Sequence, residues 1–100
     1  MLKEGSSSPW GKIQHVEALG RGACFVSTAS HGGIKLDRVR NAMVPKAARR
    51  ERGWYEEDCE AAIPLAVHED IRLRYGVSRE NALESVQRWL PEAYAALTAS

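Results

Sequence analysis

The chain has 100 residues, of which 44% are hydrophobic and 27% charged, the size and balance of one folded domain. A formal net charge of +1 excludes strong bulk attraction to nucleic acid or membranes, so any such attraction must come from a local patch. No apolar run approaches the roughly 20 residues that cross a bilayer, and the N-terminus lacks the apolar stretch of a secretory signal. We therefore expect a cytoplasmic protein whose two cysteines are free thiols.

The first third of the chain predicts a small antiparallel β-meander. Residues 1–9 are polar and serine-rich and predict a flexible arm, so the domain itself is expected over residues 10–100. Alternating side chains over 10–19 and β-branched residues over 23–28 predict two strands joined by a glycine-containing turn. Residues 34–36 predict a short third strand.

The rest of the chain predicts three or four helices, so the expected fold class is α+β with helices packed on the meander. Asp37 is expected to cap a short turn through Ala42 and Ser78 to cap the last long helix, and Gly53 and Gly76 are expected to end helices. Trp89 is expected in the core, because it continues the apolar stripe of the last long helix. Further helices are expected over residues 46–51, 55–62 and 79–90. Pro64 is expected either to kink the second of these or to open a new helix over 64–74, and Pro91 to bend or restart the last one.

A basic segment runs from Lys35 to Arg52, with seven lysines and arginines against two acids and a local charge of +5. Clustered cations can neutralise phosphates, but the segment carries no recognised nucleic-acid-binding motif. It can equally be a solvated face that pairs with nearby acids. The arginines that we expect on a possible docking surface are Arg38, Arg49, Arg50 and Arg52.

An acidic segment follows directly, with six carboxylates and no lysine or arginine between Trp54 and Asp70. At helical spacing, Cys59 and Ile63 share an inward face while the acids at its start face outward. Such a face can meet a basic partner, or it can pair with the basic segment before it. The residues expected on a docking surface here are two aromatics and four acids: Trp54, Tyr55, Glu56, Glu57, Asp58 and Glu60.

A third feature is the turn Ser30-His31-Gly32-Gly33, whose glycines let a backbone or a ligand approach closely. Turn chemistry alone explains these residue types. The alternative is a hydrolase or metal-assisted enzyme that uses His31 with Cys59, or His31 with the acids at positions 56–58. No recognised metal-ligand spacing is present, and we expect no cofactor.

Three short motifs carry a resemblance to a known family: SPWG at 8–11, VSTASHGG at 26–33 and GWYEEDCEAAI at 53–63. As a set they resemble a family of small uncharacterised domains encoded on bacterial plasmids and phages, over residues 8–70. By size and setting, the resemblance implies a likeness to anti-CRISPR and anti-restriction inhibitors. Those proteins mostly act by occupying a surface of a host nuclease complex.

The function that we expect is therefore a small non-enzymatic inhibitor that blocks a host CRISPR effector by occupying its surface. Its acids at positions 56–60 would engage a basic groove of an effector subunit or nuclease complex, with Trp54 and Tyr55 as anchors. The arginine surface is the rival within the same class. The enzyme stays open as one alternative, and a nucleic-acid-binding regulator using Lys35–Arg52 as another. No membrane partner is expected, and the expected location is the cytoplasm of a bacterial host.

Overall fold

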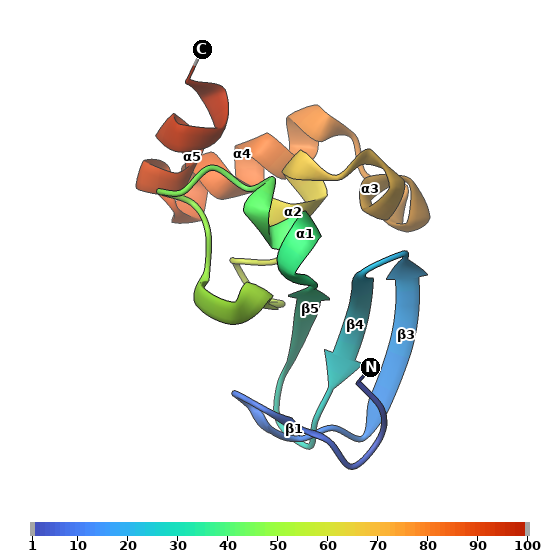
Figure 1. The fold of residues 1–100 in the computed structure, drawn as a ribbon. Coiled ribbons are helices and arrows are strands. Elements are labelled where there is room, and N and C mark those ends of the chain that lie inside the picture. Colours follow the sequence, from blue (N-terminus) through green and yellow to red (C-terminus); the bar gives the residue numbers. More distant parts are fainter. Residues whose placement is uncertain (1, 100) are drawn as a thin grey trace.

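The computed structural model describes residues 2–99 as a curved sheet with helices gathered at one end and a small ribbon at the other (Figure 1). The sheet is antiparallel with strand order β3-β4-β5-β6, and the ribbon pairs β1 with β2. The expected α+β class is confirmed. The strands are β1 (Ser7–Ser8), β2 (Gly11–Lys12), β3 (His15–Gly20), β4 (Ala23–Ser27), β5 (Gly32–Leu36) and β6 (Trp54–Glu56). The helices are α1 (Arg38–Ala42), the 3₁₀ turn η1 (Glu51–Gly53), α2 (Ala62–Val67), α3 (Glu69–Tyr75), α4 (Arg79–Trp89) and α5 (Pro91–Thr98).

The three strands of the predicted meander are present, and β6 adds a fourth at the edge of the sheet. In the β5–β6 register, Ile34 lies opposite Tyr55 and Lys35 opposite Trp54. Because side chains alternate across a strand, the first pair faces the helices and the second faces outward. This register puts Lys35 and Trp54 side by side on the outer face.

The segment predicted as a flexible arm is folded over its described part, residues 2–9. The Gly5 amide donates to the carbonyl of Ile13, and the Ile13 amide donates back to Ser6, both at 2.8 Å. Ile13 is 2% exposed, so the ribbon buries an apolar side chain of its own. The ribbon is therefore part of the domain, and it brings Trp10 onto the outer face of the sheet.

The helix ends that depend on local capping are confirmed. Asp37 accepts a hydrogen bond from the Arg40 amide at 2.8 Å, and Ser78 accepts one from the Asn81 amide at 3.1 Å. Both bonds satisfy amides that a first turn leaves without a partner. Gly76 ends α3 with φ of +65°, the left-handed conformation expected of it.

Two predicted helices are wrong. Residues 46–51 form turns that lead into η1, and residues 54–56 form β6, so the helix predicted over 55–62 begins only at Ala62. The carboxylates at 56–58 suited a helix start, but pairing with β5 overrides that local preference. The helix predicted over 64–74 is also interrupted, since His68 has extended backbone angles between α2 and α3.

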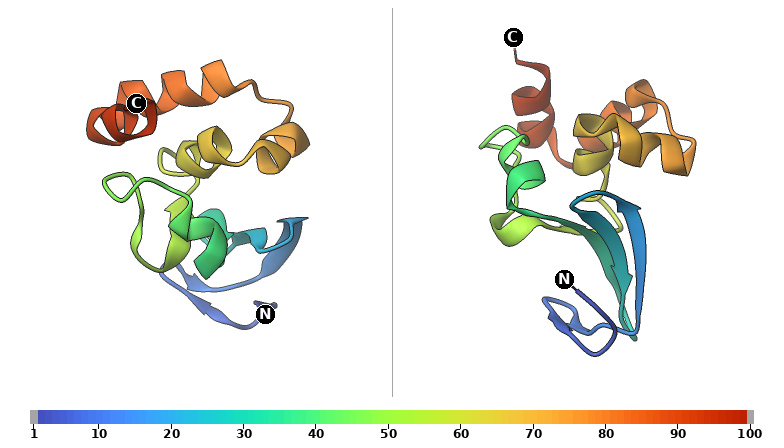
Figure 2. Two further views of the ribbon diagram at one scale, coloured as in Figure 1. Left: turned by 45° about the horizontal axis from the view of Figure 1, so that its top comes forward. Right: turned by 45° about the vertical axis from the view of Figure 1, so that its right-hand side comes forward.

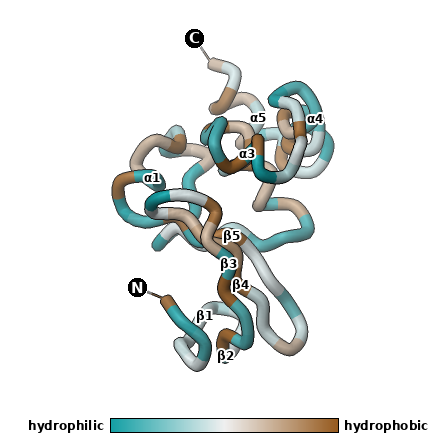
Figure 3. The backbone as a smooth tube through the Cα atoms, turned by 90° about the vertical axis from the view of Figure 1, so that its right-hand side faces the viewer, coloured by the Kyte–Doolittle hydropathy of each residue, from teal (hydrophilic) through white to brown (hydrophobic). Residues whose placement is uncertain are grey.

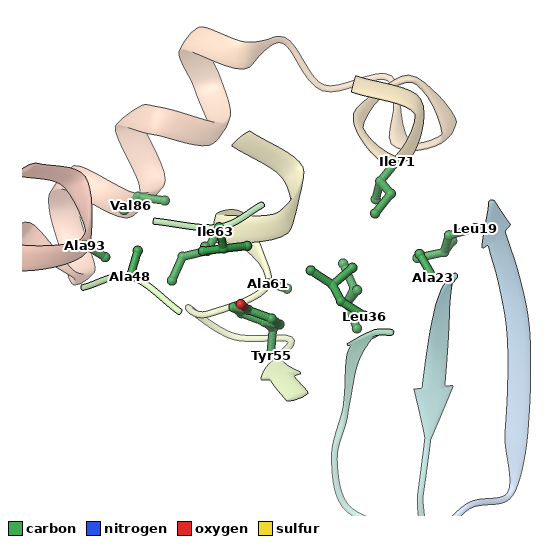
Figure 4. Packing of buried hydrophobic residues seen from close by; sticks show 12 residues of the cluster. Leu19, Ala23, Leu36, Ala48, Tyr55, Ala61, Ile63, Ile71, Val86 and Ala93 are labelled. Carbon is green, nitrogen blue, oxygen red and sulfur yellow. The ribbon is translucent and has the colours of Figure 1, made fainter. Parts of the chain in front are cut away.

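The core lies between the inner face of the sheet and the helices (Figure 4). Ile63 on α2 and Val86 on α4 are fully buried, as is Ala48 from the loop between α1 and η1. Figures 1 and 2 show this loop running beside α5. Over the described residues, the hydropathy colouring of Figure 3 shows apolar stretches both in the strands and in the helices. No helix among the described residues is long and apolar enough to cross a membrane.

The core position predicted for Trp89 is wrong, because its side chain is 60% exposed. Ala82 and Val86 carry the buried stripe of α4 as expected. At the end of that helix the chain restarts at Pro91, and Leu90 packs against the core there instead. The apolar stripe of one helix therefore does not extend across the junction to α5.

A polar cluster fastens α1 to α3 and to the β3–β4 turn. The Arg40 guanidinium donates to both carboxylate oxygens of Asp70, at 2.7 and 2.5 Å, and to the carbonyl of Arg21 at 2.6 Å. His68 is 7% exposed, and its Nε2 lies 3.1 Å from the Arg40 carbonyl oxygen. Because that oxygen can only accept a hydrogen bond, Nε2 carries the proton and donates it. A Cβ on Gly20 would come within 2.6 Å of Asp70, so the turn needs glycine there.

His68 is expected to make the fold sensitive to mild acid. Burial lowers the pKa of His68, with Arg40, Asp70 and Asp37 as its charged neighbours. Below the usual value of about 6.5 the unfolded chain binds the proton and the folded chain does not. The free energy of unfolding should therefore decrease as the pH is lowered below about 6.5, by up to about 1.4 kcal/mol per pH unit. Chemical denaturation of the wild type and His68→Gln from pH 8 to 5 checks this, and parallel curves would contradict it.

Candidate functional site

The basic segment curves around an open hollow on the surface. The hollow has a volume of about 630 Å³ and is lined by Lys35 at the end of β5, Arg38 on α1, and Arg49 and Arg52 around η1. Trp54 on β6 forms part of its wall. We call this feature the basic hollow. It gathers four of the seven cations of the basic segment, which lie up to 17 positions apart in sequence.

The charges of the basic hollow are not neutralised by the protein. Among residues 2–99, no carboxylate oxygen lies within 4.0 Å of a side-chain nitrogen of Arg38, Arg49 or Arg52. Of the described residues that line the hollow, Asp37 is the one acid, and its carboxylate caps α1. The hollow therefore keeps a strong positive potential.

Arg49 is held in place by carbonyl oxygens. Its Nε and Nη2 donate to the Val44 carbonyl at 3.1 and 3.0 Å, and Nη2 also donates to the Ala42 carbonyl at 3.2 Å. These neutral acceptors orient the guanidinium and leave its charge uncompensated. Arg49 thus acts as a fixed positive group at the hollow.

Lys35 brings a partly desolvated charge to the same place. Its ammonium donates to the Arg52 carbonyl and lies 5.2 Å from the centre of the Trp54 ring. Burial lowers the pKa of Lys35, although Cys24 and Asp37 act in the opposite direction. Cys24 stands opposite it on β4, and burial raises the pKa of that thiol. An anion beside Lys35 would therefore stabilise its charged form.

Two residues with left-handed backbone angles precede Trp54 at the basic hollow. Arg52 has φ of +61°, which is uncommon for a residue with a side chain, and Gly53 follows with φ of +79°. The two left-handed residues are the last two of η1 and lead directly into β6. As a result, Arg52 and Trp54 both line the basic hollow. Strain of this kind persists where the surrounding structure enforces it, which is frequent at functional sites.

A second hollow adjoins the basic hollow at Trp54. It has a volume of about 450 Å³ and shares Arg52 and Trp54 with the basic hollow. Its remaining lining comes from the ribbon, η1 and the turn after β6: Pro9, Trp10, Arg50, Glu51 and Glu60.

The rings of Trp10 and Trp54 form a ridge between the ribbon and the sheet. Their centroids are 5.5 Å apart and their planes meet at 86°, an edge-to-face pair. A Cβ on Gly33 would overlap the Trp10 ring and the Tyr55 carbonyl, so this glycine lets the indole approach β5 closely. Both indoles are half-buried and keep part of their surface exposed.

Tyr55 does not lie on a docking surface as predicted, because its side chain is completely buried. It faces the helices from β6, and its hydroxyl donates to Asn41 Oδ1 at 2.5 Å. The Tyr55 hydroxyl oxygen in turn accepts a hydrogen bond from the Arg50 amide at 3.3 Å. Burial raises the pKa of Tyr55, so it stays protonated. Its role is to hold the loop that carries the arginines.

Glu60 and Arg50 pair with each other and join the acidic segment to the basic one. Glu60 accepts from Arg50 Nε at 2.7 Å with one oxygen and from the Glu56 amide at 3.2 Å with the other. Both side chains of the pair are about one-third exposed. This contact is internal pairing of the kind weighed for the two segments, and it leaves both residues less available to a partner.

The other predicted acids lie in the turn after β6. Glu57 and Asp58 are exposed, and Glu56 is half-buried on the outer face. The Glu57 amide donates to the Gly32 carbonyl at 3.0 Å, and its carboxylate lies 2.6 Å from where a Gly32 Cβ would be. These three acids form a small acidic surface separate from the basic hollow.

The turn predicted to approach a ligand is packed against the protein itself. Thr28 and His31 close it through a backbone bond of 2.7 Å and two bonds of the Thr28 hydroxyl. Glu57 covers Gly32 and Trp10 covers Gly33, while Ser30 and His31 are exposed. The glycines thus serve contacts within the fold.

The residues of the enzyme alternative come from separate turns. His31 lies between β4 and β5, and Cys59 is half-buried in the turn before α2. Within the part of the chain that the structure describes, no hydrogen bond joins them. Across the same residues, no group of three histidine, cysteine or acidic side chains is placed to hold a metal ion.

Sequence reasoning missed two members of the site, Lys35 as a partner of Trp54 and Trp10 as its neighbour. The signal for the first was available in principle, because a strand at 54–56 pairs directly with 33–35. No local signal points to Trp10, since its contact depends on how the ribbon folds back.

One family model matches this chain, over residues 3–100, and is described as Domain of unknown function (DUF7007). The chain belongs to this family. The description of the DUF7007 family names no activity, ligand or partner, so the likeness to plasmid and phage domains stays a prediction. Neither a curated protein nor a solved structure matches the chain.

Proposed function

We propose that this DUF7007 domain is a non-enzymatic binding protein that occupies the surface of an anionic macromolecule through its basic hollow. The observation that carries the proposal is the imbalance of charge there. Four cations line the hollow against a single carboxylate that is already engaged as a helix cap. An oppositely charged partner relieves the repulsion among these cations and gains speed of association from their field.

The inhibitor expected from the sequence is one form of this proposal. In that form the partner belongs to a host nuclease complex such as a CRISPR effector, and this identity rests on the sequence resemblance alone. The geometry favours the arginine surface over the acidic one, since Tyr55 is buried and Glu60 is paired with Arg50. Of the four arginines expected there, Arg38, Arg49 and Arg52 line the basic hollow.

Reversing the charge of Arg38 is expected to weaken binding to a polyanion. Arg38 and Arg79 are each the first residue of a helix, each is exposed, and each follows a side-chain cap. Arg38→Glu and Arg79→Glu therefore change the net charge by the same amount at the same position of a helix, after an Asp37 cap in one case and a Ser78 cap in the other. We expect Arg38→Glu to lower the affinity for heparin about tenfold or more, and Arg79→Glu to change it less than about twofold.

The measurement is calorimetric titration at a fixed, low salt concentration, with melting curves to verify folding. Glu57→Lys serves as the test of the acidic surface and is expected to leave the affinity unchanged or to raise it. Equal losses in the two arginine variants would contradict the assignment of the basic hollow as the docking site.

A further inference from the structure

The two hollows adjoin each other and together offer room for an extended ligand. They share Arg52 and Trp54, so a chain that runs from the basic hollow into the second one passes these two residues. Their volumes of about 630 and 450 Å³ exceed what a single small anion fills. The basic hollow suits negative charge on such a chain, whereas the second hollow, lined by Glu51 and Glu60 beside Arg50 and Arg52, has no excess of positive charge.

The Trp10–Trp54 ridge, where the two hollows meet, favours a ligand that carries planar rings as well as negative charge. The ridge packs on the rest of the protein, because Trp10 lies against Gly33 and the Lys35 ammonium lies near the Trp54 ring. A planar base can stack on one of two perpendicular rings and lie beside the other. Stacking of this kind is tolerant of sequence, because every base has a flat π-face.

A surface that has both cations and aromatic rings favours a partner with both negative charge and exposed planar rings. An acidic peptide supplies the charge but not the flat rings, and a duplex keeps the faces of its bases covered. A single strand offers both, with phosphates for Lys35, Arg38 and Arg52 and free bases for the ridge. Resting on the proposed function, we infer that the anionic partner is single-stranded nucleic acid, bound with phosphates in the basic hollow and a base on the Trp10–Trp54 ridge.

The test compares two tryptophan variants with one labelled probe, an oligothymidylate of about 12 nucleotides, the length of a typical binding site. Trp54→Leu removes the ring at the ridge, whereas Trp89→Leu removes an exposed indole on α4 that lines neither hollow. Fluorescence anisotropy should show about tenfold weaker binding or more for Trp54→Leu, and less than about twofold for Trp89→Leu. Trp54→Phe should recover a large part of the loss.

A polyglutamate of the same charge separates this inference from the proposed function. If polyglutamate binds as tightly as the oligothymidylate and Trp54→Leu changes neither, the partner is an acidic protein, and the nucleic-acid inference is overturned while the proposed function stands. If neither probe binds at low salt, both are overturned. Preference for the oligothymidylate with dependence on Trp54 supports both.

The salt dependence keeps the inference testable even if Trp54→Leu fails to fold. Each phosphate neutralised on a single strand contributes about 0.7 to the slope of log affinity against log salt. Arg38→Glu should lower the slope for the oligothymidylate by about that amount, and Arg79→Glu should leave it unchanged. Equal slopes for the wild type and Arg38→Glu would overturn the placement of phosphates in the basic hollow.

Discussion

Replacing Gly53 by alanine is expected to destabilise the fold by about 3 kcal/mol or more. Gly53 has φ of +79°, a conformation that costs a residue with a Cβ about 1–2 kcal/mol. The new Cβ would also overlap the carbonyl oxygen of Leu36, a backbone atom of β5 that cannot step aside as a side chain can. The backbone shift needed to relieve this overlap adds about 1–3 kcal/mol.

Gly76→Ala is the matched control for this substitution. Gly76 has φ of +65°, so alanine meets the same backbone strain, but a Cβ there has nothing within 4 Å. We expect a loss of about 1 kcal/mol for Gly76→Ala in urea denaturation. Equal losses for the two variants would show that the close approach of Gly53 to β5 is not real. Because Gly53 joins Arg52 to Trp54, that result would also remove the reason for their shared position at the basic hollow.

Tyr55→Phe is expected to cost about 2 kcal/mol. The substitution leaves the ring in the core but removes the hydroxyl that donates to Asn41 and accepts from the Arg50 amide. Asn41 Oδ1 and the Arg50 amide, both partly buried, then each lose a hydrogen bond. Leaving a buried polar group without its partner costs more free energy than losing a hydrogen bond at the exposed surface. Faster amide hydrogen exchange at Arg50 should accompany the loss, because Tyr55 ties the arginine-bearing loop to the sheet.

Tyr94→Phe on α5 is the control for the hydroxyl. Tyr94 also packs against the core, and among residues 2–99 its hydroxyl forms no hydrogen bond. We expect its removal to change stability by less than about 0.5 kcal/mol. If thermal and chemical denaturation show an equally small change in stability for Tyr55→Phe, the Tyr55 hydroxyl does not organise the loop.

The parts of the fold that local chemistry decides were predictable from sequence. Asp37 and Ser78 begin helices because their side chains accept from first-turn amides, and Gly76 ends one because it takes positive φ readily. These signals act within four residues. The predictions that rested on them are confirmed.

The failures share a dependence on partners that are distant in sequence. Trp54 and Tyr55 form a strand because β5 pairs with them, about 20 positions earlier in the chain. The acids that follow favoured a helix start on local grounds, and tertiary pairing prevailed. Trp89 is exposed because Leu90 takes the inward position at the junction of α4 and α5.

The candidate site was predicted as two charged segments, but not as one surface. Composition alone located the cations, yet whether each has a partner depends on the fold. Arg50 is paired with Glu60, whereas Arg38 and Arg52 lie free of carboxylates in the described part of the chain. The ridge depends on Trp10, which reaches the sheet only because the ribbon folds back onto it.

The central claim is that an anionic strand binds over the basic hollow and the tryptophan ridge, and the chain's three indoles permit a direct test. Trp10 and Trp54 lie at the ridge, while Trp89 lies on α4. In an NMR titration of the labelled protein with oligothymidylate, we expect the indole N–H signals of Trp10 and Trp54 to shift and that of Trp89 to stay in place. A shift of the Trp89 signal, with those of Trp10 and Trp54 unchanged, would contradict the claim.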